Sequence, residues 1–342
     1  MTLLTNSAEG FSWTGRRVAI TGATGFVGLQ VAAQLRAAGA DVVALHRAGS
    51  NTTRLTRLGV RPQVAPLTDT TALAVGCRGA EILIHAAAAV DFRGDWELAR
   101  RVNVEGTRAV IHAARSAGVR RMVHISSIVA VGASRWPEVL DETAGWTLGS
   151  FRVSYATTKR EAEREALQAN RAGLEVVVVN PGCVVGPDDF GGSEFGTLCK
   201  RYWRGRVPIH FTGGNAFVDV RDAAAGVLAA ALRGRPGERY VLTSENRRWA
   251  AFFQDLSRAA CRTIPRLTLP DWLAPPLARV LSWTDRKKRR APSLTTEQAK
   301  LVGLYFYFSS AKARRELGFS PRPLRDSLAD AYAFWRGERR AA

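Results

Sequence analysis

The first half of the 342-residue chain alternates short runs of aliphatic residues with segments that have the apolar spacing of a helix. The runs at Arg17–Thr21 (RVAIT), Asp41–His46 (DVVALH), 81–86, 122–126 and 175–180 are continuously apolar rather than alternating in polarity. Continuous apolar strands separated by helices are typical of a parallel sheet that is buried on both faces. The sequence therefore predicts a doubly wound α/β domain with right-handed crossovers.

The pattern changes after Pro187, where glycine and aromatic residues dominate up to Phe217. Residues 217–232 again predict a strand followed by a helix, and 246–342 carry helices and loops rich in Trp, Pro and Arg. We therefore expect a main domain at 14–186 plus 213–245. A smaller, mostly helical substrate-binding part is expected at 187–212 plus 246–342.

The net charge of +19 raises the question of an acidic partner such as a nucleic acid. The basic residues are spread along the chain, and only 285–290 (DRKKRR) forms a dense run. The chain has no zinc-finger spacing and no RNA-binding aromatic motif. We therefore predict no nucleic-acid partner and assign most of the charge to a solvated basic face.

Four widely spaced cysteines, without a Cys-x-x-Cys pair, argue against a metal site and are typical of a reducing compartment. No uncharged apolar run approaches about 18–20 residues, so no membrane-spanning helix is predicted. We expect a cytoplasmic protein.

The stretch TGATGFVG places Gly22, Gly25 and Gly28 between the first predicted strand and the first predicted helix. Glycines at such a turn let the backbone approach a pyrophosphate at the helix N-terminus. A strand–helix turn without a ligand would have the same letters. Because the turn stands at the first crossover, we interpret it as the dinucleotide site of a Rossmann domain.

The end of the second strand selects the coenzyme. An acidic residue there would bind the ribose 2′-hydroxyl of NAD, whereas an Arg suits the 2′-phosphate of NADP. The sequence has Arg47 at this place, no Asp or Glu, and Ser50, Asn51 and Arg54 just behind. We predict that NADP(H) is preferred, with Arg47 as the main residue that binds its 2′-phosphate. NAD(H) is the alternative. A solvated Arg47 without a ligand would leave this choice open.

Tyr155 and Lys159 stand four residues apart in VSYATTKREAE and share one face of a predicted helix. The same spacing occurs in ordinary amphipathic helices. Six motifs in order give the pair a context: TGATGFVG, HAAA at 85–88, NVEGT at 103–107, ISS at 125–127, YATTK at 155–159 and NPG at 180–182.

Together these motifs resemble the extended short-chain dehydrogenase/reductases of the epimerase/dehydratase-like type. The resemblance covers about 15–245 and continues more loosely to 308–317. It implies that Tyr155 is a general acid/base and that Lys159 lowers its pKa and holds the nicotinamide ribose. It also implies that Ser127 hydrogen-bonds the substrate oxygen, with Ser126 as the alternative because neighbouring strand residues point in opposite directions.

The resemblance further implies a set of coenzyme contacts: Gly22, Thr24, Gly25, Phe26, Val27, Arg47, Asp69, Ala86, Ala87, Asn103, Tyr155, Lys159, Pro181, Gly182 and Val184. For two of these a structural role is an equal alternative. Asp69 could cap a helix, and Asn103 could be a satisfied buried amide or could position the active-site helix. We expect His85 and His124, which lie in apolar strands, to be structural.

Departures from the nucleotide-sugar members indicate the substrate. Cys183 replaces their usual Asn, no Arg precedes Phe217 at the diphosphate position, and Arg47 suits net reduction. The chain is therefore closer in character to dihydroflavonol reductases and 3β-hydroxysteroid dehydrogenases. We predict a reductase, or the reverse alcohol dehydrogenase, of a hydrophobic steroid-, flavonoid- or lipid-like ketone. The alternatives are a nucleotide-sugar epimerase or dehydratase with tightly bound NAD, and a non-catalytic NADP-sensing protein.

Two further segments bear on the partners. The segment 133–154 contains Trp136, Trp146 and Phe151, which suggests an aromatic wall over the substrate. A surface loop whose aromatic side chains pack on one another would have the same sequence pattern. The segment 271–290 joins Trp and Leu to the basic run and suggests a peripheral membrane contact, for which a packed amphipathic helix is the alternative. A homodimer through 96–117 and 154–172 is implied by the family.

Overall fold

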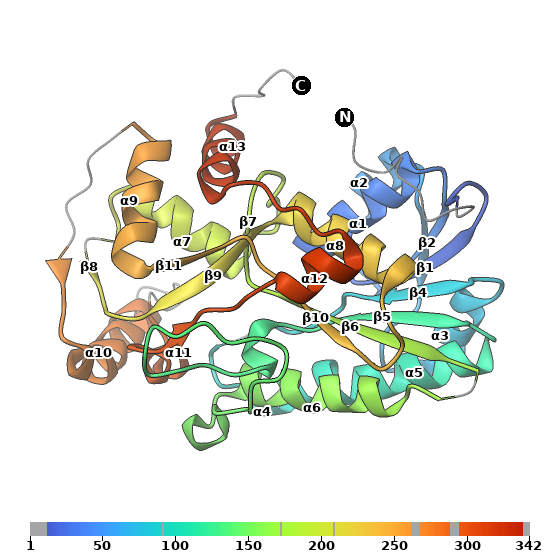
Figure 1. Ribbon diagram of the computed structural model, residues 1–342, viewed down its shortest axis with the longest axis horizontal. Coiled ribbons are helices and arrows are strands. Elements are labelled where there is room, and N and C mark those ends of the chain that lie inside the picture. The colour runs from blue at the N-terminus through green and yellow to red at the C-terminus, as the bar shows by residue number, and fades with distance from the viewer. Residues whose placement is uncertain are drawn as a thin grey trace.

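The computed structural model describes residues 12–90, 92–171, 173–207, 209–261, 267–287 and 294–337. Its centre is a seven-stranded sheet in the order β10-β6-β5-β4-β1-β2-β3, in which every pairing is parallel (Figure 1). The strands are β1 Arg17–Thr21, β2 Asp41–His46, β3 Arg61–Val64, β4 Ile82–His85, β5 Arg121–Ile125, β6 Glu175–Pro181 and β10 Arg239–Leu242.

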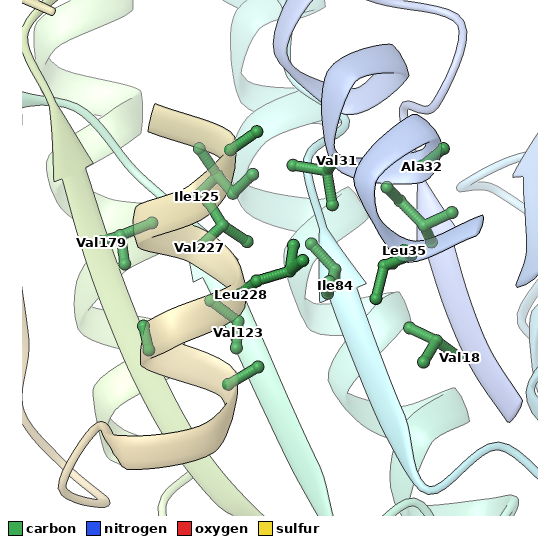
Figure 2. Close-up of a cluster of buried hydrophobic side chains, with 14 of the residues drawn as sticks. Val18, Val31, Ala32, Leu35, Ile84, Val123, Ile125, Val179, Val227 and Leu228 are labelled. Carbon is green, nitrogen blue, oxygen red and sulfur yellow. The ribbon is translucent and has the colours of Figure 1, made fainter. Parts of the chain in front are cut away.

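Helices cover both faces of this sheet. One face carries α1 (Phe26–Ala37), α8 (Val220–Arg233) and α12 (Ala311–Leu317). Figure 2 shows aliphatic side chains of α1 and α8 packed against strands β1, β4, β5 and β6. The other face carries α3 (Thr70–Cys77), α5 (Gly106–Ser116) and α6 (Ser154–Gln168). The strands are buried on both faces because their runs are continuously apolar. The predicted doubly wound Rossmann fold is confirmed.

A second, smaller sheet joins β11, β9 and β13, with β7 paired to β9, and β8 pairs with β12. Their bounds are β7 Cys183–Val185, β8 Ile209–His210, β9 Gly214–Asp219, β11 Glu245–Arg248, β12 Leu267–Thr268 and β13 Tyr305–Phe306. The helices of this part are α7 Glu194–Trp203, α9 Trp249–Ala259, α10 Ala274–Lys287, α11 Thr296–Lys300 and α13 Leu324–Arg336. An aromatic core that includes Tyr202, Phe217 and Phe252 holds part of it together.

Shorter elements connect these layers: α2 Thr53–Arg57, α4 Trp96–Ala99, η1 Arg100–Glu105, η2 Ile128–Ala130, η3 Gly149–Phe151 and η4 Asp271–Leu273. The segment 96–117 is not one continuous α-helix, because the π-helix η1 separates α4 from α5. The sequence patterns do not predict β3 or β10, which are short edge strands, and β3 carries Pro62 and exposed side chains.

The division into 14–186 plus 213–245 and 187–212 plus 246–342 stays a prediction. Within 213–245, α8 packs on the main sheet and β10 belongs to it, whereas β9 lies in the second sheet. In the described part of the chain, no helix is both long and apolar enough to cross a membrane.

Candidate active site

The predicted site residues gather at the carboxyl edge of the seven-stranded sheet. The chain runs outward from β1 through β2 to β3 and then returns to the other side of β1 as β4. In open α/β sheets, ligands bind outside the carboxyl ends of the strands at this kind of reversal. Gly22 follows β1 there, and a Cβ built on it would stand 2.5 Å from the backbone nitrogen of Ala87. With a φ of +74°, Gly22 therefore allows the β1 and β4 turns to touch.

The glycine turn presents a bare helix N-terminus. Gly25 is the N-cap of α1, no side chain caps the helix, and no acidic residue lies in its first turn. Gly28 packs against the turn so closely that a Cβ would stand 2.2 Å from the carbonyl oxygen of Gly22. Free N–H groups and the positive end of a 12-residue helix suit a pyrophosphate. Thr24 is exposed at this turn, and Phe26 and Val27 are half-buried at the start of α1.

Two arginines stand beyond the end of β2. Arg47 is exposed directly after the strand, and Arg54 is exposed on α2. The guanidinium carbon of Arg54 lies 3.6 Å from the centroid of the Phe190 ring, a cation–π contact from the loop that follows β7. Gln30 of α1 donates to Asp188 of that loop at 2.9 Å. Both contacts hold the loop beside α1 and α2.

Tyr155 lies near the start of α6 with only 8% of its surface exposed. Burial raises the pKa of its phenol to about 12, and a hydrogen bond with the Ser127 side chain opposes that rise. Phe92 packs its ring edge-on to the Tyr155 ring, with centroids 5.0 Å apart. At neutral pH the phenol is therefore a proton donor in an apolar setting.

Lys159 lies one turn after Tyr155 and is 2% exposed. Its ammonium donates to the carbonyl oxygen of Ile125 at 2.9 Å, and burial lowers its pKa to about 8. Burial and the hydrogen bond with Ser127 act on the pKa of Tyr155 in opposite directions, and the lowering of that pKa by Lys159 stays a prediction. The Ile125 contact holds Lys159 beside the Ser127 turn.

Glu163 lies one further turn along α6 and is fully buried. Its carboxylate accepts from Asn180 at 2.6 Å and from Arg239 at 2.9 Å. It opposes the fall in the pKa of Lys159. The sequence reading did not assign Glu163 a role, although its place four residues after Lys159 is the signal that could have found it. Phe92 was also missed, since no local pattern predicts its contact with Tyr155.

The two candidate serines occupy different environments. Ser127 caps η2 and contacts Tyr155, as the first choice of the sequence reading requires. Ser126 is 6% exposed, and among the described residues its hydroxyl finds no hydrogen-bond partner. The geometry thus brings Ser127, Tyr155 and Lys159 together.

Asn103 is buried in the π-helix with its amide bonded inside the protein. Its oxygen accepts from Ala89 at 2.8 Å, and its nitrogen donates to Ala89 at 3.2 Å and to Thr158 of α6 at 3.0 Å. These bonds join the turn after β4 to the active-site helix, which favours the positioning role over direct coenzyme contact. π-Helical turns are frequent at functional sites.

The remaining predicted contacts lie at the same edge. Ala86 donates to Thr21 at 3.1 Å beside the glycine turn. Pro181 ends β6, Gly182 follows it, and Val184 is in β7. Asp69 is exposed and caps α3 by accepting from Ala72 at 2.8 Å, so its capping role is present in the structure.

Two buried histidines lie in the strands beneath the site, and the first of them connects neighbouring elements. His85 bonds through its ring nitrogens to Thr21 at 2.7 Å and to Thr107 at 3.0 Å, and burial lowers its pKa to about 3. His124 packs 5.2 Å from it, with its pKa also lowered by burial. Both rings are therefore neutral and lie in the sheet interior.

The segment 133–154 is packed in part against the protein. Trp146 donates to Val129 at 3.1 Å and, like Phe151, joins the apolar cluster around Ile128 and Phe308. Trp136 is 74% exposed. Self-packing thus accounts for Trp146 and Phe151, and Phe92 rather than Trp136 is the aromatic side chain at the tyrosine.

Comparison with known proteins agrees with this geometry. Residues 18–243 match the model of the NAD dependent epimerase/dehydratase family. The chain belongs to this family. A Synechocystis protein provisionally named dihydroflavonol 4-reductase is 34% identical over 91% of this chain and 92% of its own length. Sterol demethylase protein B of Methylococcus capsulatus is 35% identical over 93% of this chain and 97% of its own.

Among solved structures, that of gox2253 superposes on this family member with a TM-score of 0.82 at 34% identity, covering 94% of this chain and 98% of that one. The resemblance inferred from the motifs is thereby confirmed. As a family member with relatives named as reductases and dehydrogenases, the chain is an oxidoreductase that uses a nicotinamide dinucleotide. Its bare α1 N-terminus and the Gly22–Ala87 approach fit that group.

Proposed function

We propose that the chain is an NADPH-dependent reductase of a hydrophobic ketone, or the corresponding alcohol dehydrogenase. The buried, protonated Tyr155 phenol, hydrogen-bonded to Ser127 and covered by Phe92, carries this proposal. A phenol with a pKa of about 12 keeps its proton at neutral pH, which is the state that reduction requires.

Each residue of the site has its own role in the proposed reaction. The nicotinamide coenzyme supplies the hydride when it is bound. Ser127 donates a hydrogen bond to the carbonyl oxygen and places it beside the Tyr155 hydroxyl. Tyr155 gives its proton to that oxygen as negative charge develops there. Lys159, charged below pH of about 8 and held by Ile125, binds the ribose and offsets the negative charge left on Tyr155.

The preference for NADPH is supported by the β2 end. Arg47 and Arg54 are exposed there, and neither an Asp nor a Glu occupies 46–54. A guanidinium matches phosphate oxygens with paired hydrogen bonds, whereas a ribose hydroxyl calls for an acceptor. The Phe190 ring packs against the Arg54 guanidinium at 3.6 Å, and such a contact lowers the entropic cost of ordering that side chain on a phosphate.

An apolar substrate is supported by the surroundings of Tyr155. Phe92 lies against the ring, and Cys183, a thiol whose burial raises its pKa well above the usual value, is close enough to affect Tyr155. Neither offers the charged groups that a sugar diphosphate needs. Relatives named for dihydroflavonol and sterol chemistry are in keeping with this. A cytoplasmic location, a peripheral membrane contact through 271–290 and a homodimer through 96–117 and 154–172 stay predictions, and the side chains of 286–290 lie outside the described residues.

The test is turnover of a ketone panel with NADPH by wild type, Tyr155→Phe and Ser127→Ala. We expect Tyr155→Phe to bind NADPH as wild type does, by fluorescence titration, and to lose at least about 100-fold in kcat. Ser126→Ala is the matched control and should retain activity. Turnover retained in Tyr155→Phe would refute the assigned role. Purification with tightly bound NAD and inertness toward every ketone would favour a nucleotide-sugar enzyme instead.

A further inference from the structure

A buried glutamate of α11 contacts the start of the catalytic helix. Glu297 is 4% exposed, and its carboxylate accepts hydrogen bonds from the backbone nitrogen of Ser154 at 3.0 Å and from the Ser154 hydroxyl at 2.7 Å. Ser154 is the first residue of α6 and directly precedes Tyr155. The contact therefore joins the C-terminal part of the chain to the helix that carries the proposed acid/base.

The start of α6 has no cap of its own. Its N-cap is Val153, whose side chain offers no hydrogen-bond acceptor, and its first turn contains no acidic residue. The first N–H groups of a helix have no partner within the helix, and the helix dipole favours a carboxylate near them. Glu297 supplies this carboxylate from 143 positions away in the sequence.

Both carboxylate oxygens of Glu297 are used on Ser154. Burying a carboxylate is costly unless hydrogen bonds compensate for the lost water. Here the compensation comes from the backbone N–H and the hydroxyl of one residue, at the point where α6 begins. The burial of Glu297 is therefore tied to the position of that first turn.

The same segment contacts the surroundings of the tyrosine a second time. Lys300 of α11 donates to the carbonyl oxygen of Arg152, just before α6, at 3.0 Å. Leu304, which follows α11, belongs to the apolar cluster against which Phe92 packs. Phe92 is the ring that lies against Tyr155. Residues 296–304 thus contact both the start of α6 and the cluster beside Phe92.

The second turn of α6 has tertiary bonds of its own. Lys159 donates to the carbonyl oxygen of Ile125 at 2.9 Å, and Thr158 accepts from Asn103 at 3.0 Å. These bonds do not involve Glu297. Loss of the Glu297 carboxylate should therefore loosen the turn that carries Tyr155 and leave Lys159 in place.

We propose that Glu297 is a positioning residue, which holds Ser154 so that the first turn of α6 keeps the Tyr155 hydroxyl in place for proton transfer. Glu297 acts through Tyr155 and touches neither the coenzyme nor the substrate. The effect on catalysis rests on the proposed function, whereas the cap on α6 does not.

The experiment compares ketone reduction at saturating NADPH with fluorescence titration by NADPH. We expect Glu297→Ala to lower kcat about ten- to a hundredfold and to change Kd for NADPH less than about twofold, because a small displacement of a reacting group is costly while Lys159 stays held. Glu297→Gln keeps an acceptor for the Ser154 N–H and should recover at least about half of the wild-type kcat. Glu97→Ala, which removes an exposed carboxylate of α4, is the matched control and should behave as wild type does.

Amide hydrogen exchange gives a readout that does not depend on turnover. In Glu297→Ala the peptide covering 153–158 should exchange at least about tenfold faster than in wild type, and the last turn of α6 should exchange at an unchanged rate. Faster exchange over the whole of α6 would show a general structural role and overturn the proposal.

Two kinetic outcomes also overturn it. One is equal kcat in wild type and Glu297→Ala, and the other is a parallel loss of kcat and NADPH affinity that Glu297→Gln does not rescue. If wild type reduces no ketone, the reductase assignment fails. Exchange at 153–158 then decides by itself whether Glu297 holds the start of α6.

Discussion

Replacing Glu163 with Gln should move the alkaline limit of coenzyme binding to lower pH. Lys159 holds its proton against burial, and the Glu163 carboxylate one turn away favours the charged form. Charge on Lys159 is present below its pKa of about 8 and is lost as pH rises through that value. If Lys159 binds the coenzyme ribose as a cation, affinity for NADPH should fall across the same range.

The size of the shift can be worked from the helix. Cβ atoms four residues apart are about 5–6 Å apart, and unit charges about 6 Å apart interact by roughly 2.8 kcal/mol at an effective dielectric of ~20. That energy equals about two pKa units. The same carboxylate also accepts hydrogen bonds from Asn180 at 2.6 Å and from Arg239 at 2.9 Å. We therefore expect about half the full effect, a fall of roughly one unit in the pKa of Lys159.

The assay is fluorescence titration with NADPH from pH 6 to pH 9.5. At pH 8, Glu163→Gln should bind roughly fivefold more weakly than wild type, and the two should converge near pH 6. Glu161→Gln, on the exposed face of the same helix and paired with Arg100 at 3.2 Å, should leave the midpoint unchanged.

A second control separates charge from structure. Arg239→Gln breaks the buried Arg239–Glu163 ion pair, as Glu163→Gln does, but it removes a positive charge. It should therefore not lower the pH midpoint of NADPH binding. If Glu163→Gln and wild type share one midpoint, or if Arg239→Gln lowers it equally, the electrostatic role of Glu163 is refuted.

Three other measurements test separate parts of the site. Arg47→Asp combined with Arg54→Ala should raise KM for NADPH at least about tenfold, because charged hydrogen bonds to phosphate contribute about 1.5–3 kcal/mol each. The same variant should lower KM for NADH, because the new carboxylate accepts a hydrogen bond from the ribose 2′-hydroxyl; an unchanged ratio of the two constants would contradict the assignment. Gly22→Ala should lower the free energy of unfolding by about 1–3 kcal/mol in urea denaturation, since its Cβ would meet Ala87 at 2.5 Å. Gly49→Ala, with a φ of +78° and nothing within 4 Å, should cost less, and equal losses would dismiss the contact. In the alcohol-oxidation direction Tyr155 must lose its proton, and because burial raises its pKa to about 12 the rate should keep climbing with pH above 9 in stopped-flow measurements; a plateau below pH 9 would show a much lower pKa.

Most strands of the main sheet, and the helices between them, can be predicted from the sequence because the signal for each is local. The runs RVAIT and DVVALH become β1 and β2 with the expected bounds, and the first helix follows the glycine turn, beginning at Phe26. A buried parallel strand needs only a short apolar run, and a helix needs only its period. The short strand β3 escaped because its residues, RPQV, have neither property.

For the candidate site as well, the sequence predicts the residues in local motifs but not the contacts between distant segments. Gly22, Ser127, Tyr155 and Lys159 stand in motifs whose spacing already places them at strand ends or on one helix face. Contacts between distant segments have no such spacing. Phe190 meets Arg54 across 136 positions of sequence, and Glu297 binds Ser154 across 143.

The chain by itself therefore determined the Rossmann fold, the coenzyme turn and the tyrosine–lysine pair, since each depends on residues within a few positions of one another. Only the tertiary structure decided the protonation of Tyr155, because burial raises its pKa and the hydrogen bond with Ser127 opposes that rise. It also decided which face of α10 is exposed, because the helical period shows an apolar stripe but not what packs against it. Desolvation and packing are sums over neighbours brought together by folding, and a linear pattern does not contain them.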